Sequence, residues 1–305
     1  MSKDTLGLLL GFVGMVIFAL TVPVTRVAVQ SFDPVFVTVG RAAVAGSLAL
    51  ATLWARGRRV PERRHWPRLM LGAVLLIGGF PVCLALALTT AEASHGGVVL
   101  AIVPLGTAVA ATLTGGERPS AGFWLCAVLG TAIVLGFVLK RSHGDVTAAD
   151  LLFLAAAACA AFGYTAGGVL ARSMPGWEVI CWQLVLALPV TAALTLRQLP
   201  EIDWHAPAAA WASFAYVSVF SMFLGFFAWN AGLALGGVAR VGQIQLLQTF
   251  VVLAGSWLLL NEHIDAEMLV FAAAVVAVVA LGRRAQVARP AAEAAPPAPI
   301  GKDSR

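Results

Sequence analysis

The stretch ARVGQIQLLQTFVVLAGSWLLLNE, from Ala239 to Glu262, decides the fold class of this chain. It contains 21 uncharged residues between Arg240 and Glu262, and a helix of that length rises far enough to cross a hydrocarbon core about 30 Å thick. The sequence therefore predicts a transmembrane helix. Because an uncompensated amide is costly in lipid, we expect one face of this helix to line the bundle interior or a water-filled cavity. The amides in question are Gln243, Gln245 and Gln248.

The end of this stretch has a counterpart earlier in the chain. LTGGERPSA (113–121) aligns with LLLNEHIDA (258–266), so that Glu117 falls on Glu262. At a similar spacing, FDPVFVTVGR (32–41) aligns with MPGWEVICWQ (174–183). The chain is therefore expected to consist of two related halves, residues 1–140 and 150–282. The tail, residues 283–305, is rich in Ala, Pro and charge, and is predicted to be disordered and cytoplasmic.

The composition places the whole chain in the membrane. Hydrophobic residues make up 60% and charged residues 11%, whereas charged residues make up about a quarter of soluble domains. A length of 305 residues leaves room for roughly ten spans and no sizeable soluble domain. The net charge is +5, but most basic residues flank apolar runs, as topology determinants do, so we expect no nucleic-acid partner.

The four cysteines lie in apolar runs, which favours packing roles over a disulfide framework or a zinc site. They are Cys83, Cys126, Cys159 and Cys181. We expect no metal and no cofactor. The sequence leaves the oligomeric state open.

Ten helices are predicted, five in each half. Their ranges are 5–25, 35–54, 69–90, 94–115, 121–139, 151–171, 178–196, 208–230, 239–262 and 266–282. In the first helix, Gly7 and Gly11 form a GxxxG pair that allows close helix approach, and Pro23 is expected to kink the helix. The eighth helix is expected to end near Asn230, with a turn marked by Gly232, Gly236 and Gly237.

The distribution of basic residues predicts the orientation in the membrane. With both termini in the cytoplasm, that side carries 15 Lys and Arg residues and the opposite side four, which the positive-inside rule favours. Because five helices per half is an odd number, the second half begins on the opposite face from the first. The fold class is therefore all-α integral membrane, with ten transmembrane helices as two inverted five-helix repeats. This architecture recurs in secondary transporters, which place substrate near the midplane between the halves.

Three sets of motifs resemble the ten-helix EamA-type branch of the drug/metabolite transporter superfamily. They are FALTVPVTRVAV (18–29), DPVFVTVGRAAVAG (33–46) and the paired turns LTGGERPS and LLLNEHID. The resemblance covers about residues 5–282 and implies export or exchange of small metabolites across the bacterial inner membrane, without ATP hydrolysis. The chain departs from the family pattern at Thr249, where the first half has Pro104, and at Val13-Gly14, where an aromatic-Gly pair is common.

Arg41 is the most informative single residue, because a guanidinium about a third of the way into a span is costly and usually points to the interior. It could bind a carboxylate or phosphate of a substrate. Alternatively, it could make a structural or gating contact with helix-end carbonyls, Asp33 or Glu92. Gln183 is its inverted equivalent and could either face a substrate or form an interhelical hydrogen bond.

The remaining substrate-binding candidates are aromatic, amide and histidine side chains. Gln245 and Gln248 lie three residues apart and so share a helix face. Aromatic rings could stack on an aromatic or cationic substrate, and those rings belong to Tyr164, Trp182 and Trp229. His95, at the outer end of the fourth helix, could titrate near neutral pH, although the favoured interpretation is a helix-end histidine in a polar loop. Tryptophans at span ends, including Trp54, Trp66 and Trp177, are expected to be interface anchors.

The carboxylates indicate which activities to exclude. Glu117 and Glu262 are expected to cap the helix that follows each of them. No Asp or Glu lies well inside a predicted span, which disfavours a drug/proton antiporter of the small multidrug-resistance type. No Walker A loop, HExxH or GxSxG motif is present, so we do not expect an enzyme.

These observations favour an inner-membrane exporter of small metabolites that works by alternating access, with amino acids, possibly aromatic ones, as the substrate. Its partners would be that small molecule and the lipid bilayer. Alternatives are a multidrug or cationic-compound exporter, and a transporter of nucleosides or sugar phosphates. A lipid-handling enzyme and a non-transporting scaffold belong to other classes.

Overall fold

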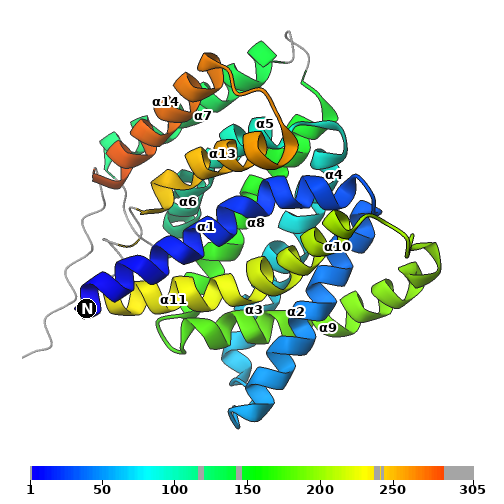
Figure 1. Ribbon diagram of the computed structural model, residues 1–305. Coiled ribbons are helices and arrows are strands. Elements are labelled where there is room, and N and C mark those ends of the chain that lie inside the picture. Colours follow the sequence, from blue (N-terminus) through cyan, green and yellow to red (C-terminus); the bar gives the residue numbers. More distant parts are fainter. Residues whose placement is uncertain (1, 116–119, 142–145, 237–240, 242–243, 285–305) are drawn as a thin grey trace, which may run out of the picture.

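A computed structural model describes residues 2–115, 120–141, 146–236, 241 and 244–284. Within these ranges, eight helices are long and apolar enough to cross a membrane, and two shorter apolar helices cover Gln245–Leu260 and Ala266–Gly282. Together they confirm the ten-helix, all-α membrane fold (Figure 1). The helices are numbered below as crossings 1 to 10.

Crossings 3 and 4 of the first half are interrupted helices. Crossings 1, 2 and 5 are α1 (Lys3–Val29), α2 (Pro34–Ala55) and α7 (Ala121–Arg141). Crossing 3 follows the short 3-10 turn η1 (Arg63–His65) and consists of α3 (Trp66–Gly72), the π-helical stretch η2 (Ala73–Gly79) and α4 (Phe80–Thr90). Crossing 4 consists of α5 (Ala93–Val99), the 3-10 stretch η3 (Leu100–Ile102) and α6 (Val103–Gly115).

The second half repeats this pattern. Crossings 6, 7 and 10 are α8 (Ala148–Leu170), α9 (Gly176–Gln198), which leads into the 3-10 turn η4 (Leu199–Glu201), and α14 (Ala266–Arg284). Crossing 8 consists of α10 (Ala208–Ala215), the π-helical stretch η5 (Tyr216–Leu224) and α11 (Gly225–Gly236). In crossing 9, the 3-10 stretch η6 (Gln245–Leu247) precedes α13 (Gln248–Leu260).

The predicted end of crossing 8 near Asn230 is wrong, because α11 continues to Gly236. Gly232 and Gly236 do not form a turn; they pack against α1. A Cβ on Gly232 would lie 2.5 Å from the Gly11 nitrogen, and a Cβ on Gly7 would collide with the Gly236 backbone. Two small-residue pairs on facing helices therefore bring the α1 and α11 backbones together, as GxxxG pairs do in membranes. Gly237 lies outside the described residues.

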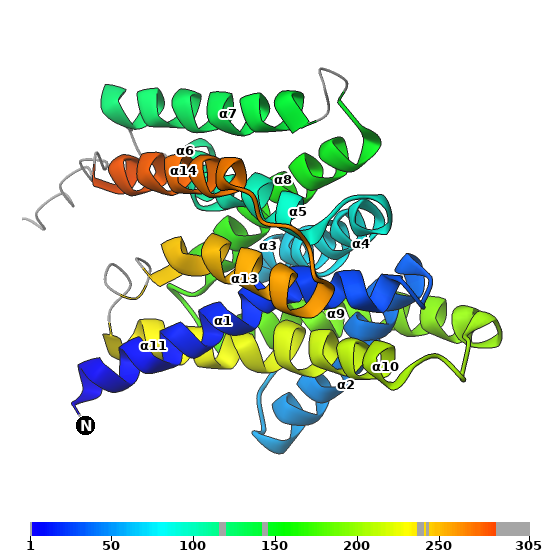
Figure 2. The ribbon, with the colours of Figure 1, turned by 45° about the horizontal axis from the view of Figure 1, so that its top comes forward.

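The packing of the helices follows the inverted repeat. Helix α1 packs most extensively against α11 and α13 of the second half, and its counterpart α8 packs against α4 and α6 of the first. Each first helix thus contacts the third and fourth crossings of the other repeat, which are crossings 8 and 9 for α1 and crossings 3 and 4 for α8. The helices α2 and α9 pair with each other, as do α7 and α14, and Figure 2 shows α7 and α14 together along one side of the bundle. The largest buried cluster mixes both halves, with Met15 and Phe137 from the first and Phe153 and Met268 from the second.

Candidate functional site: a central cavity between the two halves

A cavity lies between the two halves. The space not filled by atoms amounts to about 990 Å³, including its opening. The side chains used below are Phe18, Thr21, Arg41, Phe80, Tyr164, Ser221, Phe226, Gln245 and Gln248, all of which line it.

The three helix interruptions η2, η3 and η5 and the 3-10 stretch η6 at the start of α13 all lie at this cavity. Leu76 and Ile77 of η2 line it from crossing 3, and Ser221 and Met222 of η5 line it from crossing 8. The 3-10 stretches η3 and η6, which occupy equivalent positions in the two repeats, also contribute lining residues. Irregular backbone at membrane depth is tolerated where it is covered by protein or faces a cavity, and discontinuous helices of this kind form the binding sites of many transporters.

Arg41 reaches the cavity from α2 and is only 3% exposed. Its Nη2 donates to the Ser221 hydroxyl at 3.2 Å. The Ser221 hydroxyl lies 2.7 Å from that of Thr21, which donates to the Ile17 carbonyl at 3.2 Å. The Arg41 Nε has no hydrogen-bond partner among the described residues. Neutral hydroxyls therefore hold the guanidinium without balancing its charge.

Neither carboxylate considered as a partner for Arg41 forms an ion pair with it. Asp33 caps α2, where it accepts from the backbone nitrogens of Val35 at 2.8 Å and Phe36 at 3.2 Å. Within the described part of the chain, no ion pair joins Arg41 to Asp33, Glu92 or any other carboxylate. A buried cation without a counter-ion is costly, and an anion entering the cavity would offset that cost.

The structure brings four of the eight candidate substrate-binding residues together at the cavity: Arg41, Tyr164, Gln245 and Gln248. Tyr164 comes from α8, while Gln245 and Gln248 lie where η6 passes into α13. A cation, amides and a phenol from both halves thus share one space with the apolar rings of Phe18, Phe80 and Phe226.

The other four candidates lie elsewhere. Gln183 is 1% exposed, and its amide fills the recess left by the missing side chain of Gly72 on α3. Trp182, its neighbour on α9, packs against buried apolar residues. Trp229 packs against Phe18, with ring centres 6.5 Å apart. The inverted equivalent of Arg41 therefore does not reach the cavity, because the close contact between α9 and α3 takes up its side chain.

His95 joins the two halves instead of lining the cavity. Its Nε2 lies 2.7 Å from Oδ1 of Asp150 on α8, and its ring packs against Phe137 and Phe153 at centroid distances of 5.0 and 6.0 Å. The second Asp150 oxygen accepts from the Thr147 nitrogen at 2.9 Å and hydroxyl at 2.6 Å. His95 lies near the start of α5, as the helix-end interpretation expected, but it is enclosed between aromatic rings and does not lie in a polar loop.

The expected role of Glu262 needs a correction. It accepts from the backbone nitrogens of Ala93 at 2.8 Å and Ser94 at 2.7 Å, so it caps α5 in the first half and not the helix that follows it. The left-handed backbone of Asn261, with φ 52°, ends α13 just before Glu262. The following helix is capped by Asp265, which accepts from the Met268 nitrogen at 2.8 Å. Glu117 lies outside the described residues.

Charged contacts between the halves occur at both ends of the bundle. At the end that holds His95, Arg141 pairs with Asp265 at 2.8 Å and Lys140 with Glu267 at 2.9 Å. At the opposite end, Arg58 pairs with Glu178 at 3.1 Å.

The sequence did not predict the two hydroxyls near Arg41 or the π-helical and 3-10 stretches at the cavity. Thr21 and Ser221 are small polar residues in apolar runs, and such residues have no pattern that distinguishes a ligand of Arg41 from ordinary packing. Once the 3-10 stretch η3 is known in the first half, the internal repeat predicts a similar stretch at the position of η6 in the second half. Asp150 was missed because it falls at the first turn of a span, where a carboxylate is a common cap.

Comparisons with known proteins agree with this architecture. The EamA-like transporter family matches residues 5–139 and again residues 147–282. "Uncharacterized transporter YdeK" from Bacillus subtilis (strain 168) is 41% identical over 285 residues, which cover 93% of this chain and 99% of that protein. A solved crystal structure with 21% identity superposes with a TM-score of 0.61 over 92% of this chain and 99% of the other, which supports the fold. The double match covers nearly all of the two repeats, and the chain therefore belongs to the EamA-like transporter family.

Proposed function

We propose that this transporter exports small carboxylate-bearing metabolites, most specifically amino acids, across the bacterial inner membrane by alternating access. The observation that carries the proposal is the buried, unneutralised Arg41 in the wall of a cavity between the two halves. A guanidinium has a planar fork of donors that matches a carboxylate, and the low dielectric of a bundle interior strengthens that pair.

The rest of the cavity fits the other parts of an amino acid. Gln245 and Gln248 supply amide oxygens that can accept from an ammonium group. Phe18, Phe80 and Phe226 offer apolar ring surface to a side chain. The unfilled space of the cavity, about 990 Å³ including its opening, falls within the range of pockets that hold small molecules.

Two other substrate classes fit less well. The lining residues that the structure describes include no Asp or Glu, so a cationic drug would meet Arg41 without a counter-charge. A sugar phosphate can also be held by an arginine, but a phosphate monoester carries about −1.5 to −2 charge at neutral pH. Among the described lining residues, Arg41 alone is cationic. Its single positive charge balances a carboxylate better than it balances a phosphate monoester.

The test is counterflow into proteoliposomes preloaded with one unlabelled compound at a time. Radiolabelled amino acids, nucleosides, sugar phosphates and quaternary amines form the panel. We expect exchange with at least one amino acid. Transport of quaternary amines without any amino-acid exchange would refute the proposal, and exchange restricted to sugar phosphates would move the substrate class to phosphate esters.

The proposed orientation has both termini in the cytoplasm. A reporter active only in the cytoplasm should therefore work when fused after Arg305 or within the loop 56–68. A periplasm-only reporter active at Arg305 would contradict the orientation while leaving the inverted repeat intact.

A further inference from the structure

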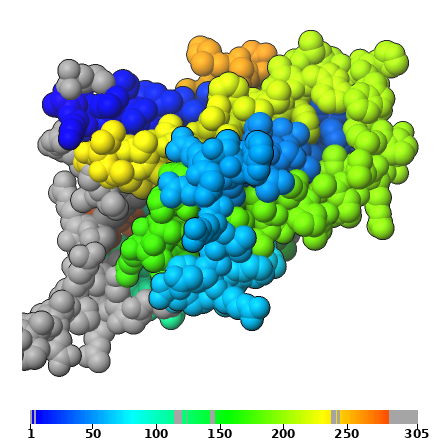
Figure 3. Space-filling view, turned by 90° about the horizontal axis from the view of Figure 1, so that it is seen from below, coloured from blue at the N-terminus to red at the C-terminus, as the bar shows by residue number. Residues whose placement is uncertain are grey.

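The connection between α2 and α3 carries a dense group of exposed arginines. It comprises residues 54–68, so that it includes the end of α2 and the first residues of α3. Six arginines occur from Arg56 to Arg68, and all six are exposed. The connection joins two membrane spans, Pro34–Ala55 and Arg63–Thr90, so it lies close to the membrane surface. In Figure 3 the blue-to-cyan part of the chain, which includes this connection, stands out on the face that is shown.

Part of this positive charge is already neutralised by the protein. Arg58 pairs with Glu178 at 3.1 Å, and Arg64 pairs with Glu62 at 2.9 Å. The guanidinium groups of Arg56 and Arg58 lie over the ring of Trp177 at 4.9 and 5.2 Å. These contacts fix the connection against the start of α9 in the second half.

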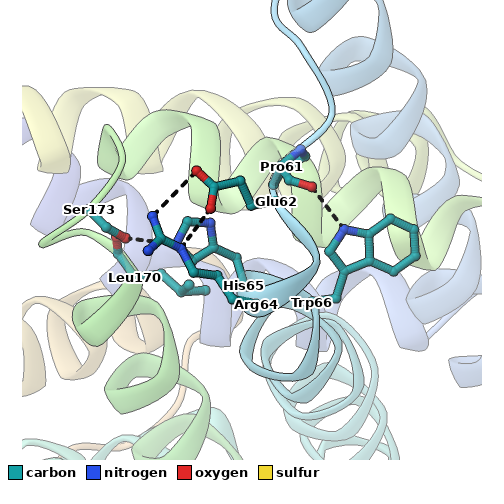
Figure 4. Close-up of polar contacts among 7 residues, drawn as sticks. All are labelled: Pro61, Glu62, Arg64, His65, Trp66, Leu170 and Ser173. Atoms are coloured by element: carbon teal, nitrogen blue, oxygen red, sulfur yellow. Dashed lines mark hydrogen bonds and ion pairs between the residues drawn. The ribbon is translucent and has the colours of Figure 1, made fainter.

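The middle of the connection also meets the second half. The His65 Nε2 lies 3.4 Å from the Ser173 hydroxyl, and the Trp66 indole donates to the Pro61 carbonyl at 3.1 Å (Figure 4). These contacts give the connection a fixed shape. The charges that it presents are therefore held in place by the fold.

Three arginines of the connection have no carboxylate partner. In the described part of the chain, no ion pair involves Arg59, Arg63 or Arg68. The neighbouring exposed Arg172, one residue before Ser173, has none there either. Excess positive charge therefore gathers where two spans leave the membrane, and it comes from both halves of the protein.

We propose that this arginine surface, made of Arg59, Arg63, Arg68 and Arg172, binds the phosphate headgroups of anionic phospholipids in the leaflet that it faces. A planar guanidinium pairs bidentately with a phosphate. Four to eight basic residues directly beside a span are typical of anionic-lipid binding.

Apolar side chains within the connection favour lipid over a soluble partner. Trp54 is 84% exposed and Val60 66% exposed, and Trp66 is exposed as well. Tryptophan at a span end sits at headgroup depth, which places the arginines beside it within reach of lipid phosphates. The inference does not depend on which substrate the transporter carries.

The experiment measures lipid binding to the full chain purified in a neutral detergent. Native mass spectrometry follows titration with phosphatidylglycerol and, separately, with phosphatidylcholine. We expect the wild-type protein to prefer phosphatidylglycerol by at least about tenfold in low salt, because each basic residue near anionic lipid contributes a severalfold gain. The triple variant Arg59→Gln/Arg63→Gln/Arg68→Gln should lose most of that preference.

Two control variants separate charge at this surface from charge in general. Arg197→Gln removes a cation at the opposite end of α9 and should keep the wild-type preference. Replacing the same three arginines by lysine should keep most of the preference, and it also provides a folded comparison if the glutamine triple variant does not yield monodisperse protein.

Three results would overturn the proposal. The first is an unchanged preference for phosphatidylglycerol in the glutamine triple variant. The second is a preference in the wild type that persists at about 1 M salt, where exposed charges are screened within about 3 Å. The third is displacement of the lipid by inorganic phosphate at the same concentration. The last result would assign the surface to a soluble phosphate ion.

Discussion

Replacing Arg41 by glutamine should separate the stability of this protein from its function. Among the described residues, the Arg41 guanidinium donates one hydrogen bond, to the neutral Ser221 hydroxyl at 3.2 Å. Such a bond contributes about 0.5–1.5 kcal/mol net, whereas a buried charge without a partner costs several kcal/mol. We therefore expect Arg41→Gln to leave the melting temperature unchanged or to raise it.

The effect on binding should have the opposite sign. A charge-assisted pair between Arg41 and a substrate carboxylate is worth about 1.5–3 kcal/mol, which corresponds to about tenfold to a hundredfold in affinity. Arg41→Lys keeps the charge but loses the bidentate fork. Its affinity should fall between those of the wild type and Arg41→Gln.

The assay compares each amino acid of the panel with its amide, which lacks the carboxylate. Binding to purified protein gives an affinity ratio of acid to amide, and thermal unfolding is measured on the same samples. The ratio should favour the acid by tenfold or more in the wild type and fall close to one in Arg41→Gln. Gln183→Ala is the matched control, because Gln183 is buried away from the cavity, and it should retain the wild-type ratio.

An unchanged acid-to-amide ratio in folded Arg41→Gln would remove Arg41 from the binding site. A large drop in melting temperature with an intact ratio would instead make Arg41 a structural clamp. Either result would withdraw the main reason for choosing amino acids as the substrate.

Three further predictions concern stability, measured by unfolding of the purified protein. Gly232→Ala should destabilise the protein by about 1–3 kcal/mol, because the added Cβ would lie 2.5 Å from the Gly11 nitrogen. The control Gly168→Ala should be tolerated, because no atom lies within 4 Å of the Cβ that it adds. Equal effects of the two variants would contradict the close packing of α1 and α11. Glu262→Gln should lower the free energy of unfolding by about 0.5–2 kcal/mol, because it weakens the hydrogen bonds to the start of α5. Glu201→Gln is the control at an exposed position. Equal effects of the two variants would show that Glu262 does not stabilise α5 as a cap. The pKa of Asp265 lies below its ordinary value, chiefly because the carboxylate accepts from the Met268 nitrogen and further because Arg141 is close. A lowered pKa means that the carboxylate stabilises the fold above about pH 4 and that this stability is lost on further acidification. Asp265→Asn should therefore make the stability of the protein less sensitive to acid. An unaltered dependence of stability on pH would show that Asp265 does not contribute.

The sequence by itself determined the class of this protein and most of its helices. Uninterrupted apolar runs predict membrane spans because backbone groups in lipid must be bonded within the segment itself. The repeated turns and the odd number of spans per half predicted the inverted architecture. Arg41 could be singled out because a lone cation in an apolar run is rare enough to be informative.

Side chains that share a helix face were also partly predictable. Gln245 and Gln248 both reach the cavity, as a separation of three residues in a helix suggests. The periodicity of one helix, however, does not specify which neighbour that helix faces. Trp229 was expected at the substrate site and instead packs on Phe18.

Only the tertiary structure decided which parts of the two halves meet. Each first helix packs against the third and fourth crossings of the opposite repeat, and α2 packs against η5. The second of these contacts sets Arg41 of one half beside Ser221 of the other. The same arrangement draws His95 to Asp150 and Glu262 to the start of α5. These partners lie 55 to 180 residues apart in the chain, and local sequence patterns describe turns and helix faces over a few residues only. The physical reason is that pairing across such distances depends on how whole helices pack, and in lipid that packing is governed by close backbone contacts such as those of Gly7, Gly11, Gly232 and Gly236.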